Sequence, residues 1–141
     1  MDNNWGRVSS FREQGGIWPS HCVAETHGAE PPIPFSIPPG TVIVRKGTTP
    51  QEEAYSGFEG TTLDGQLKRA GVNRLFVGGL ATDYCVFNTV KDALTHSYEM
   101  YLLIDAIRVV NVQPTDGKEA EKTMIQQGAH PIQLRDLAAP K

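Results

Sequence analysis

The stretch that decides the fold is Leu75–Val86, whose sequence is LFVGGLATDYCV. Its first three residues form a short apolar run of the kind found in buried strands, and Gly78-Gly79 is expected to end that strand. A helix is expected to follow at once and to carry Cys85 in its first turn. The helix is indicated by apolar residues at helical spacing, namely Val86, Val90, Ala93 and Leu94.

Cys85 stands where a thiol can become reactive. Thr82 or Asp83 is placed to cap the helix, and the cysteine is then close to the positive end of the helix dipole, which favours thiolate over thiol. The backbone N–H groups of the first turn can hold the oxyanion that forms when a thiolate attacks a carbonyl carbon. The position therefore predicts a cysteine nucleophile, and so a hydrolase or an acyl-transfer enzyme.

Lys46 is the second candidate catalytic residue. It follows a short β-branched strand predicted at 41–44, as Cys85 follows the strand predicted at 75–77. Open α/β sheets bind ligands outside the carboxyl ends of their strands, and a lysine ammonium there would favour the thiolate form of Cys85 further. The alternatives are a cysteine that only packs and a solvated lysine at a strand end.

The bulk properties favour a single small domain. A chain of 141 residues is expected to form one domain, 1–141, that buries about two-thirds of its unfolded surface. The net charge of -3 gives no reason to expect nucleic acid or a membrane as partner, and no apolar run reaches the length of a membrane span. The two cysteines, Cys22 and Cys85, fit no disulfide framework, so the cytoplasm is the expected compartment.

The chain divides by composition into an irregular and a regular part. Residues 1–40 form a proline-rich entry segment in which no long helix or central strand is expected. Beyond it, strands alternate with helices, which indicates an α/β fold with a parallel sheet and flanking helices. The strands are predicted at 41–44, 75–77, 100–104 (stopped by Asp105) and 131–134, and the helices at 63–70, from the Cys85 turn to 97, and at 116–127.

Four segments resemble one family, in order along the chain. They are Ser10–Val23, which contains WPSHCV, then Arg45–Gly47, then Tyr55–Gly60, which reads YSGFEG, and finally Gly79–Val86, which reads GLATDYCV. The last segment resembles the isochorismatase-like cysteine hydrolases, and the first and third together resemble the nicotinamidases (pyrazinamidases) among them. The resemblance implies a Rossmann-like fold of three layers, α/β/α.

The resemblance also implies a reaction, the hydrolysis of nicotinamide to nicotinate and ammonia through a thioester on Cys85. The oxyanion would lie on the backbone N–H groups of Ala81 and Cys85. A cis peptide bond would join Leu80 to Ala81, and Lys46 matches the family's catalytic lysine.

Aromatic residues and one histidine complete the site that the resemblance implies. Trp18 and Tyr55 match positions that line the pyridine pocket, and Tyr84 could add to that wall; ordinary loop packing is the alternative for Trp18 and Tyr55. His21 matches one ligand of the family's divalent metal ion, zinc or a similar ion.

Two parts of the family's site have no clear counterpart. The catalytic aspartate, which moves protons in the family, belongs to an N-terminal strand with which nothing in this chain aligns. The other metal ligands would fall at Asp2, Asn4 and Val8, and valine cannot ligate a metal ion. The domain is therefore expected to be N-terminally incomplete and to lack a strand from the middle of the family's sheet.

Three functions remain as hypotheses. The first is a nicotinamidase-type amidohydrolase of NAD salvage, acting on a small amide such as nicotinamide, with little activity expected from this chain alone. The second is a truncated, catalytically dead subunit that docks onto a full-length subunit or forms a homo-oligomer. The third uses the Cys85–Lys46 pair as a reactive thiolate, for example in redox sensing.

Overall fold

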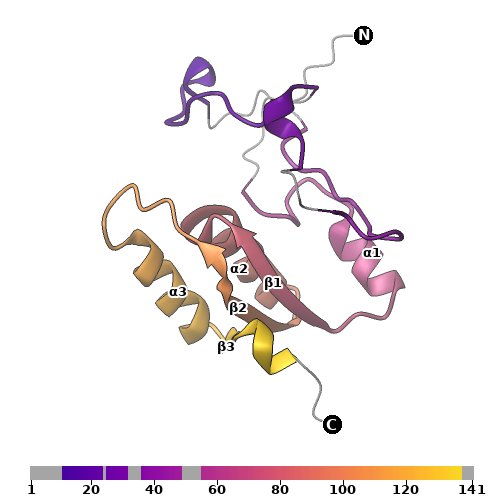
Figure 1. The fold of residues 1–141 in the computed structure, drawn as a ribbon. Helices are drawn as coiled ribbons and strands as arrows, with labels where there is room; N and C mark the ends of the chain where they lie inside the picture. Colours follow the sequence, from indigo (N-terminus) through magenta and orange to yellow (C-terminus); the bar gives the residue numbers. More distant parts are fainter. Residues whose placement is uncertain (1–10, 24, 32–35, 49–54, 138–141) are drawn as a thin grey trace. The chain divides into compact units, whose positions relative to one another are not determined.

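The computed structural model describes residues 11–23, 25–31, 36–48 and 55–137. The chain divides into two compact units, Met1–Ala54 and Tyr55–Lys141. The described part of the first unit is irregular apart from two short 3-10 turns, η1 (Arg12–Gln14) and η2 (His27–Ala29), and an isolated bridge between Phe11 and Trp18. The second unit holds the regular elements, and Figure 1 shows its strands with the helices around them.

The second unit is built on a parallel sheet, as the alternating pattern predicts. Its strands are β1 (Arg74–Leu80), β2 (Glu99–Arg108) and β3 (His130–Ile132), hydrogen-bonded in that order with both pairs parallel. The connections between them are helical, as parallel strands require. The α/β fold class is therefore confirmed.

The helices also lie where their apolar spacing predicts them. They are α1 (Leu63–Arg69), α2 (Phe87–Thr95) and α3 (Asp116–Gln126). Gly71 and Gly128 follow α1 and α3 with φ of 69° and 115°, a backbone conformation in which a side chain is strained. These two glycines therefore mark the helix ends correctly in the sequence.

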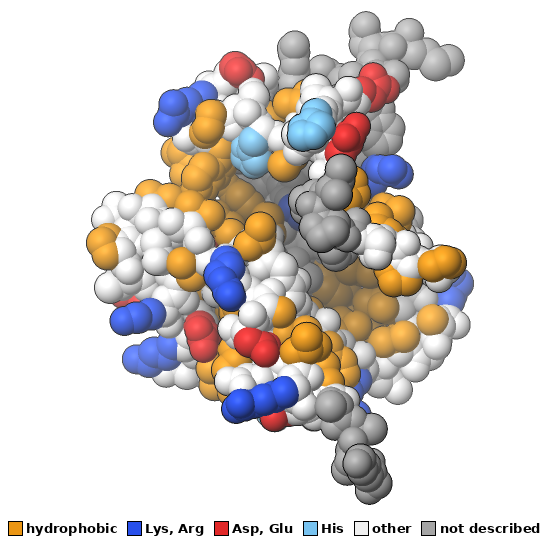
Figure 2. All heavy atoms as spheres, in the orientation of Figure 1, with side chains coloured by type: hydrophobic (Ala, Val, Ile, Leu, Met, Phe, Trp, Pro, Cys, Tyr) orange, Lys and Arg blue, Asp and Glu red, His pale blue; other side chains and the backbone are white. Residues whose placement is uncertain are grey.

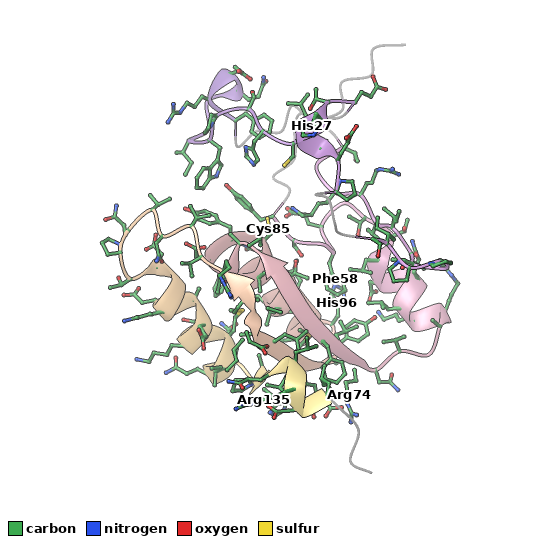
Figure 3. The ribbon with its side chains drawn as sticks, viewed as in Figure 1. His27, Phe58, Arg74, Cys85, His96 and Arg135 are labelled. Atoms are coloured by element: carbon green, nitrogen blue, oxygen red, sulfur yellow. The ribbon has the colours of Figure 1, made fainter. Side chains whose placement is uncertain are left out.

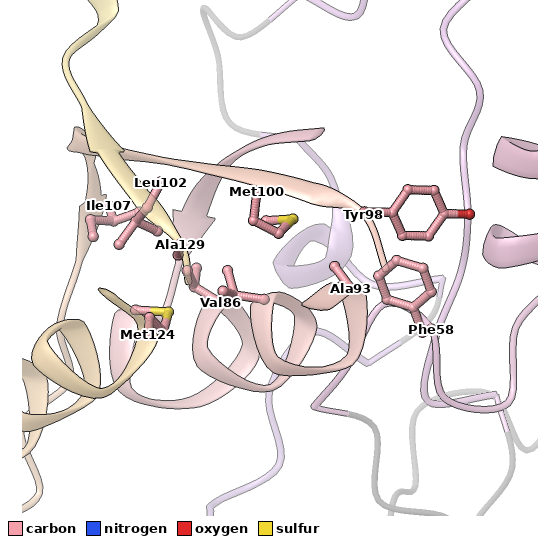
Figure 4. Packing of buried hydrophobic residues seen from close by; sticks show 10 residues of the cluster. Phe58, Val86, Ala93, Tyr98, Met100, Leu102, Ile107, Met124 and Ala129 are labelled. Carbon is pink, nitrogen blue, oxygen red and sulfur yellow. The ribbon is translucent and has the colours of Figure 1, made fainter. Parts of the chain in front are cut away.

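Alternate residues of β2 form the centre of the hydrophobic core. Met100 and Leu102 are fully buried and pack with Val90 of α2 and Met124 of α3. Figure 4 shows the cluster between the sheet and these helices, where burying each large side chain contributes roughly 1.5–3 kcal/mol. The core therefore fixes α2, and with it the turn that leads into α2, against the sheet.

Apolar side chains also remain at the surface of the second unit. Phe76 of β1 stacks on Tyr101 of β2 with ring centroids 4.9 Å apart, yet it is 44% exposed, and Leu80 at the end of β1 is 72% exposed. Figure 2 shows apolar side chains between the charged ones on the face in view.

Two strand ends differ from the sequence prediction. β1 does not end at Gly78-Gly79, and β2 does not end at Asp105. The register between the two strands shifts between Val77 and Gly79, so pairing resumes beyond Asp105. The Asp105 carboxylate accepts a hydrogen bond from the Leu134 N–H, at 3.0 Å from each oxygen, which gives this polar residue a partner inside the irregular stretch.

The prediction of a strand at 41–44 is wrong. Residues 41–48 contain no strand, and Val42 and Ile43 are 68% and 56% exposed. A β-strand needs a neighbour for its backbone groups, and no described residue of the first unit pairs with this segment. The β-branched composition of residues 41–44 was therefore not enough to predict a strand.

Among the described residues no helix is long and apolar enough to cross a membrane.

Replacing Gly117 by alanine is expected to lower the free energy of unfolding by about 1–3 kcal/mol. The new Cβ would lie 2.1 Å from Cγ1 of Val109, so the loop after β2 would have to shift. Gly65→Ala in α1 is the matched control, because there a Cβ meets only the flexible end of Arg69, at 3.4 Å. The Gly65→Ala change should raise the free energy of unfolding by about 0.5–1 kcal/mol. Urea denaturation measures both, and equal effects would contradict the packing of α3 on Val109.

Candidate active site

The turn between β1 and α2 carries Cys85. The peptide bond Leu80–Ala81 is cis, as the resemblance implies, and a single π-helical turn, Thr82–Val86, follows it directly. The Ala81 carbonyl accepts hydrogen bonds from the N–H groups of Tyr84 at 3.1 Å and Val86 at 3.0 Å. Cys85 is half-buried, and Figure 3 shows it at the end of the sheet from which this turn leaves.

The predicted caps of this helix are wrong. The N-cap position is Ala81, with no side-chain hydrogen bond. Thr82 is buried, and among the described residues its hydroxyl has no partner. Both oxygens of Asp83 are used elsewhere, by the backbone N–H groups of Val110 and Asn111 at 3.0 and 2.7 Å. The turn is thus held from outside by the loop after β2, and not from within by a cap.

Two of the predicted aromatic residues lie together, and one of them, Tyr84, directly precedes Cys85 in the turn. The ring centroids of Tyr55 and Tyr84 are 5.6 Å apart. The segment that carries Tyr55 is tied to α2, since the Gly57 N–H donates to the Thr89 hydroxyl at 2.9 Å. Phe58 of the same segment is buried and stacks on His96 at 5.3 Å, as Figure 3 shows. These contacts keep the tyrosine pair next to the turn.

Tyr84 is a neutral phenol at physiological pH. Burial, and then the negative charges of Asp83 and Asp116, raise its pKa above the ordinary value. Its hydroxyl can therefore donate a hydrogen bond to a ligand as well as accept one.

An acidic depression of about 330 Å³ adjoins the turn. It is lined by Asp83, Tyr84, Phe87, Asp116, Glu119, Ala120 and Thr123.

Trp18 and His21 lie in a folded loop of the first unit. The Arg12 N–H donates to the Trp18 carbonyl at 2.7 Å, and the ring of His21 lies 5.0 Å from that of Phe11, which is buried. His21 Nδ1 lies 2.8 Å from the Pro19 carbonyl oxygen. With its proton on Nδ1, the ring donates to that carbonyl and keeps a lone pair on Nε2, the arrangement common in metal-binding histidines.

One histidine does not make a metal site. In the described ranges no three His, Cys, Asp or Glu side chains come together as a metal-binding group. The other predicted ligand positions, Asp2, Asn4 and Val8, lie outside the described residues. The described residues therefore do not fit a divalent ion by themselves.

The second unit thus brings together four predicted site residues, Tyr55, Ala81, Tyr84 and Cys85. The three others, Trp18, His21 and Lys46, belong to the first unit. Trp18 is half-buried, while Lys46 and His21 are exposed.

Residues 6–136 match the isochorismatase domain family. The chain belongs to this family. The match covers most of the 141 residues and reaches into both units, so the resemblance seen in four short segments extends over most of this chain.

Nicotinamidases are among the similar proteins of this family. The nicotinamidase of Escherichia coli (strain K12) is 37% identical over 126 residues, which are 85% of this chain and 59% of that protein. The nicotinamidase of Acinetobacter baylyi is 32% identical over 127 residues, 86% of this chain and 59% of its own length. The chain thus spans about three-fifths of the length of these curated relatives.

Solved structures of pyrazinamidases and nicotinamidases are also similar to this chain. A pyrazinamidase of Pyrococcus horikoshii in complex with zinc is 45% identical, with a TM-score of 0.84 over 92% of this chain and 70% of that one. PnC1 from L. infantum in complex with nicotinate is 30% identical, with a TM-score of 0.86 over 97% of this chain and 72% of that one. The isochorismatase-like fold is confirmed.

Sequence reasoning missed the residues that hold the Cys85 turn in place. The Asn88 amide donates to the Tyr84 carbonyl at 2.8 Å, and Asn111 Oδ1 accepts from the Gly117 N–H at 2.9 Å. The Asn88 contact reaches from α2 back to the turn over four residues, a spacing at which the sequence could have suggested it. The partners of Asp83 and Asn111 lie in loops, and no periodic pattern marks such contacts.

The reactivities of the two cysteines test the site. Cys85 in a Cys22→Ser variant should react with iodoacetamide at neutral pH about tenfold faster than Cys22 in a Cys85→Ser variant, because a cysteine at the start of a helix lies near unpaired backbone N–H groups and the helix dipole. Exposure alone gives the opposite order, since Cys22 is exposed and Cys85 half-buried. Intact-mass spectrometry follows both rates. Faster labelling of Cys22 would show that Cys85 is an ordinary packed thiol.

Proposed function

We propose that this protein is a cysteine amidohydrolase that converts nicotinamide, or a close aromatic amide, to the carboxylate and ammonia. The observation that carries the proposal is the Cys85 turn at the carboxyl end of β1 with the Tyr55–Tyr84 pair beside it. Support comes from the similarity to nicotinamidases and to a structure that contains nicotinate.

In the proposed reaction, the sulfur of Cys85 forms a bond to the amide carbon, and the backbone N–H groups of Ala81 and Cys85 hold the oxyanion. The carbon–nitrogen bond breaks, and the nitrogen leaves as ammonia with the proton that the thiol has lost. Water then cleaves the thioester, which releases nicotinate and restores the thiol. Lys46 supports the thiolate through its positive charge.

Trp18, Tyr55 and Tyr84 are proposed to hold the aromatic ring of the substrate. Flat rings give contact area and orientation to a planar ligand, and the Tyr84 hydroxyl offers a hydrogen bond. His21 is proposed as one ligand of a divalent ion, in line with the zinc in the similar pyrazinamidase. No step is assigned to that ion, because the described residues supply one ligand and not a set.

The proposed setting is NAD salvage in the cytoplasm, with a small-molecule amide as substrate. A non-catalytic subunit that docks onto a longer relative is the second candidate. The similar proteins favour the hydrolase over that candidate, since the nicotinamidases of Escherichia coli and Acinetobacter baylyi are among them.

Ammonia release from nicotinamide tests the proposed activity. The folded protein should release ammonia slowly but above background, with and without added Zn²⁺, and Cys85→Ala should reduce the rate to background because the covalent step is lost. Cys22→Ser is the control, since it removes the other thiol. Full activity of Cys85→Ala, or no ammonia from a folded protein that labels at Cys85, would contradict the proposal.

Replacing Tyr55 by leucine tests the substrate contact. The change keeps an apolar side chain of useful size but removes the ring next to Tyr84. KM for nicotinamide should rise about threefold to tenfold, the worth of one aromatic pair, while iodoacetamide labels Cys85 at an unchanged rate. Steady-state kinetics measures the first and mass spectrometry the second. An unchanged KM would remove Tyr55 from the proposed ring-binding wall.

A further inference from the structure

Asp83 makes two hydrogen bonds that no local role explains. The Val110 N–H donates to Oδ1 at 3.0 Å, and the Asn111 N–H donates to Oδ2 at 2.7 Å. One carboxylate thus holds two consecutive backbone groups of a loop 27 and 28 residues further along the chain. Hydrogen bonds to an ionised acceptor are roughly twice as strong as neutral ones.

The loop that Asp83 holds is itself fixed to α3. Asn111 has a φ of 53°, and its side-chain oxygen accepts from the Gly117 N–H at 2.9 Å, at the start of the helix. Val109 lies so close to Gly117 that a Cβ there would be 2.1 Å from it. A continuous set of contacts therefore runs from the Cys85 turn through residues 109–111 to α3.

We propose that Asp83 is a positioning residue that sets the orientation of Cys85. The two residues belong to the same π-helical turn, Thr82–Val86, and the turn has no side-chain cap of its own. The clamp on Val110 and Asn111 replaces that cap. It fixes where the thiol and the backbone N–H groups of the turn point, which a reaction at sulfur requires.

The negative charge of Asp83 opposes the formation of a thiolate at Cys85, although its hydrogen bonds orient the thiol. Asp83, Asp116 and Glu119 line the acidic depression beside Tyr84, and negative charges near a thiol disfavour its thiolate. Removing the charge alone should therefore make Cys85 react at lower pH. Removing the clamp should make it react more slowly and at higher pH. The sign of the change separates the two effects.

The inference rests on the proposed role of Cys85 as nucleophile, but its test follows the thiol and not the turnover of an amide. The test variant is Asp83→Asn in a Cys22→Ser background, because an amide has one oxygen for the two N–H donors. Glu119→Gln removes a charge from the same depression. Asp105→Asn alters another carboxylate that holds a distant backbone N–H, that of Leu134.

Iodoacetamide labelling of Cys85 is measured against pH for all four proteins. Asp83→Asn should lower the rate at neutral pH about tenfold and raise the pH at which the rate is half of its maximum. Glu119→Gln should leave that pH unchanged or lower it, and Asp105→Asn should leave it unchanged. Hydrogen exchange should become faster in residues 82–86 and 110–111 of Asp83→Asn together.

A pH profile of Asp83→Asn that matches the parent or shifts to lower pH would overturn the proposal, even if the variant melts at lower temperature. Should Asp83→Asn fail to fold, Asn111→Gly serves instead, since glycine tolerates the positive φ and removes only the bond to Gly117. A smaller slowing of the same sign is expected there, and an unchanged rate would overturn the proposal.

Discussion

The rest of the structure depends on how the chain passes from β1 into α2. Cys85 lies five residues after Leu80, where the strand ends, and the Ala81 carbonyl closes the turn by accepting two backbone hydrogen bonds. The core behind it, around Met100 and Met124, keeps α2 against the sheet. The position of the thiol thus follows from packing that has no part in chemistry itself.

The sequence predicted this central arrangement well, because each part of it has a local signal. The apolar run at 75–77, the helical spacing after Cys85, and the glycines that end α1 and α3 all describe neighbours in the chain. The strand at 41–44 failed for the opposite reason. A strand exists only with a partner, and β-branched residues say nothing about whether a partner is present.

In the candidate site, too, the sequence predicted the features with a local signal and missed those that depend on distant partners. Cys85, Ala81, Tyr84 and Tyr55 could be named from motifs, and the structure places them in one unit. The helix cap could not, because Asp83 bonds to a loop 27 residues away. The register between β1 and β2 also shifts between Val77 and Gly79, and such a shift leaves no periodic trace in the sequence.

The proposed function requires that Cys85 form a covalent bond to the carbonyl carbon of nicotinamide. The most direct measurement mixes the folded protein with nicotinamide, stops the reaction with acid, and determines the intact mass and the modified peptide. We expect a nicotinoyl group on the peptide that contains Cys85, and no such group in Cys85→Ala. Ammonia release without any adduct in the parent, or an adduct on Cys22 instead, would contradict it.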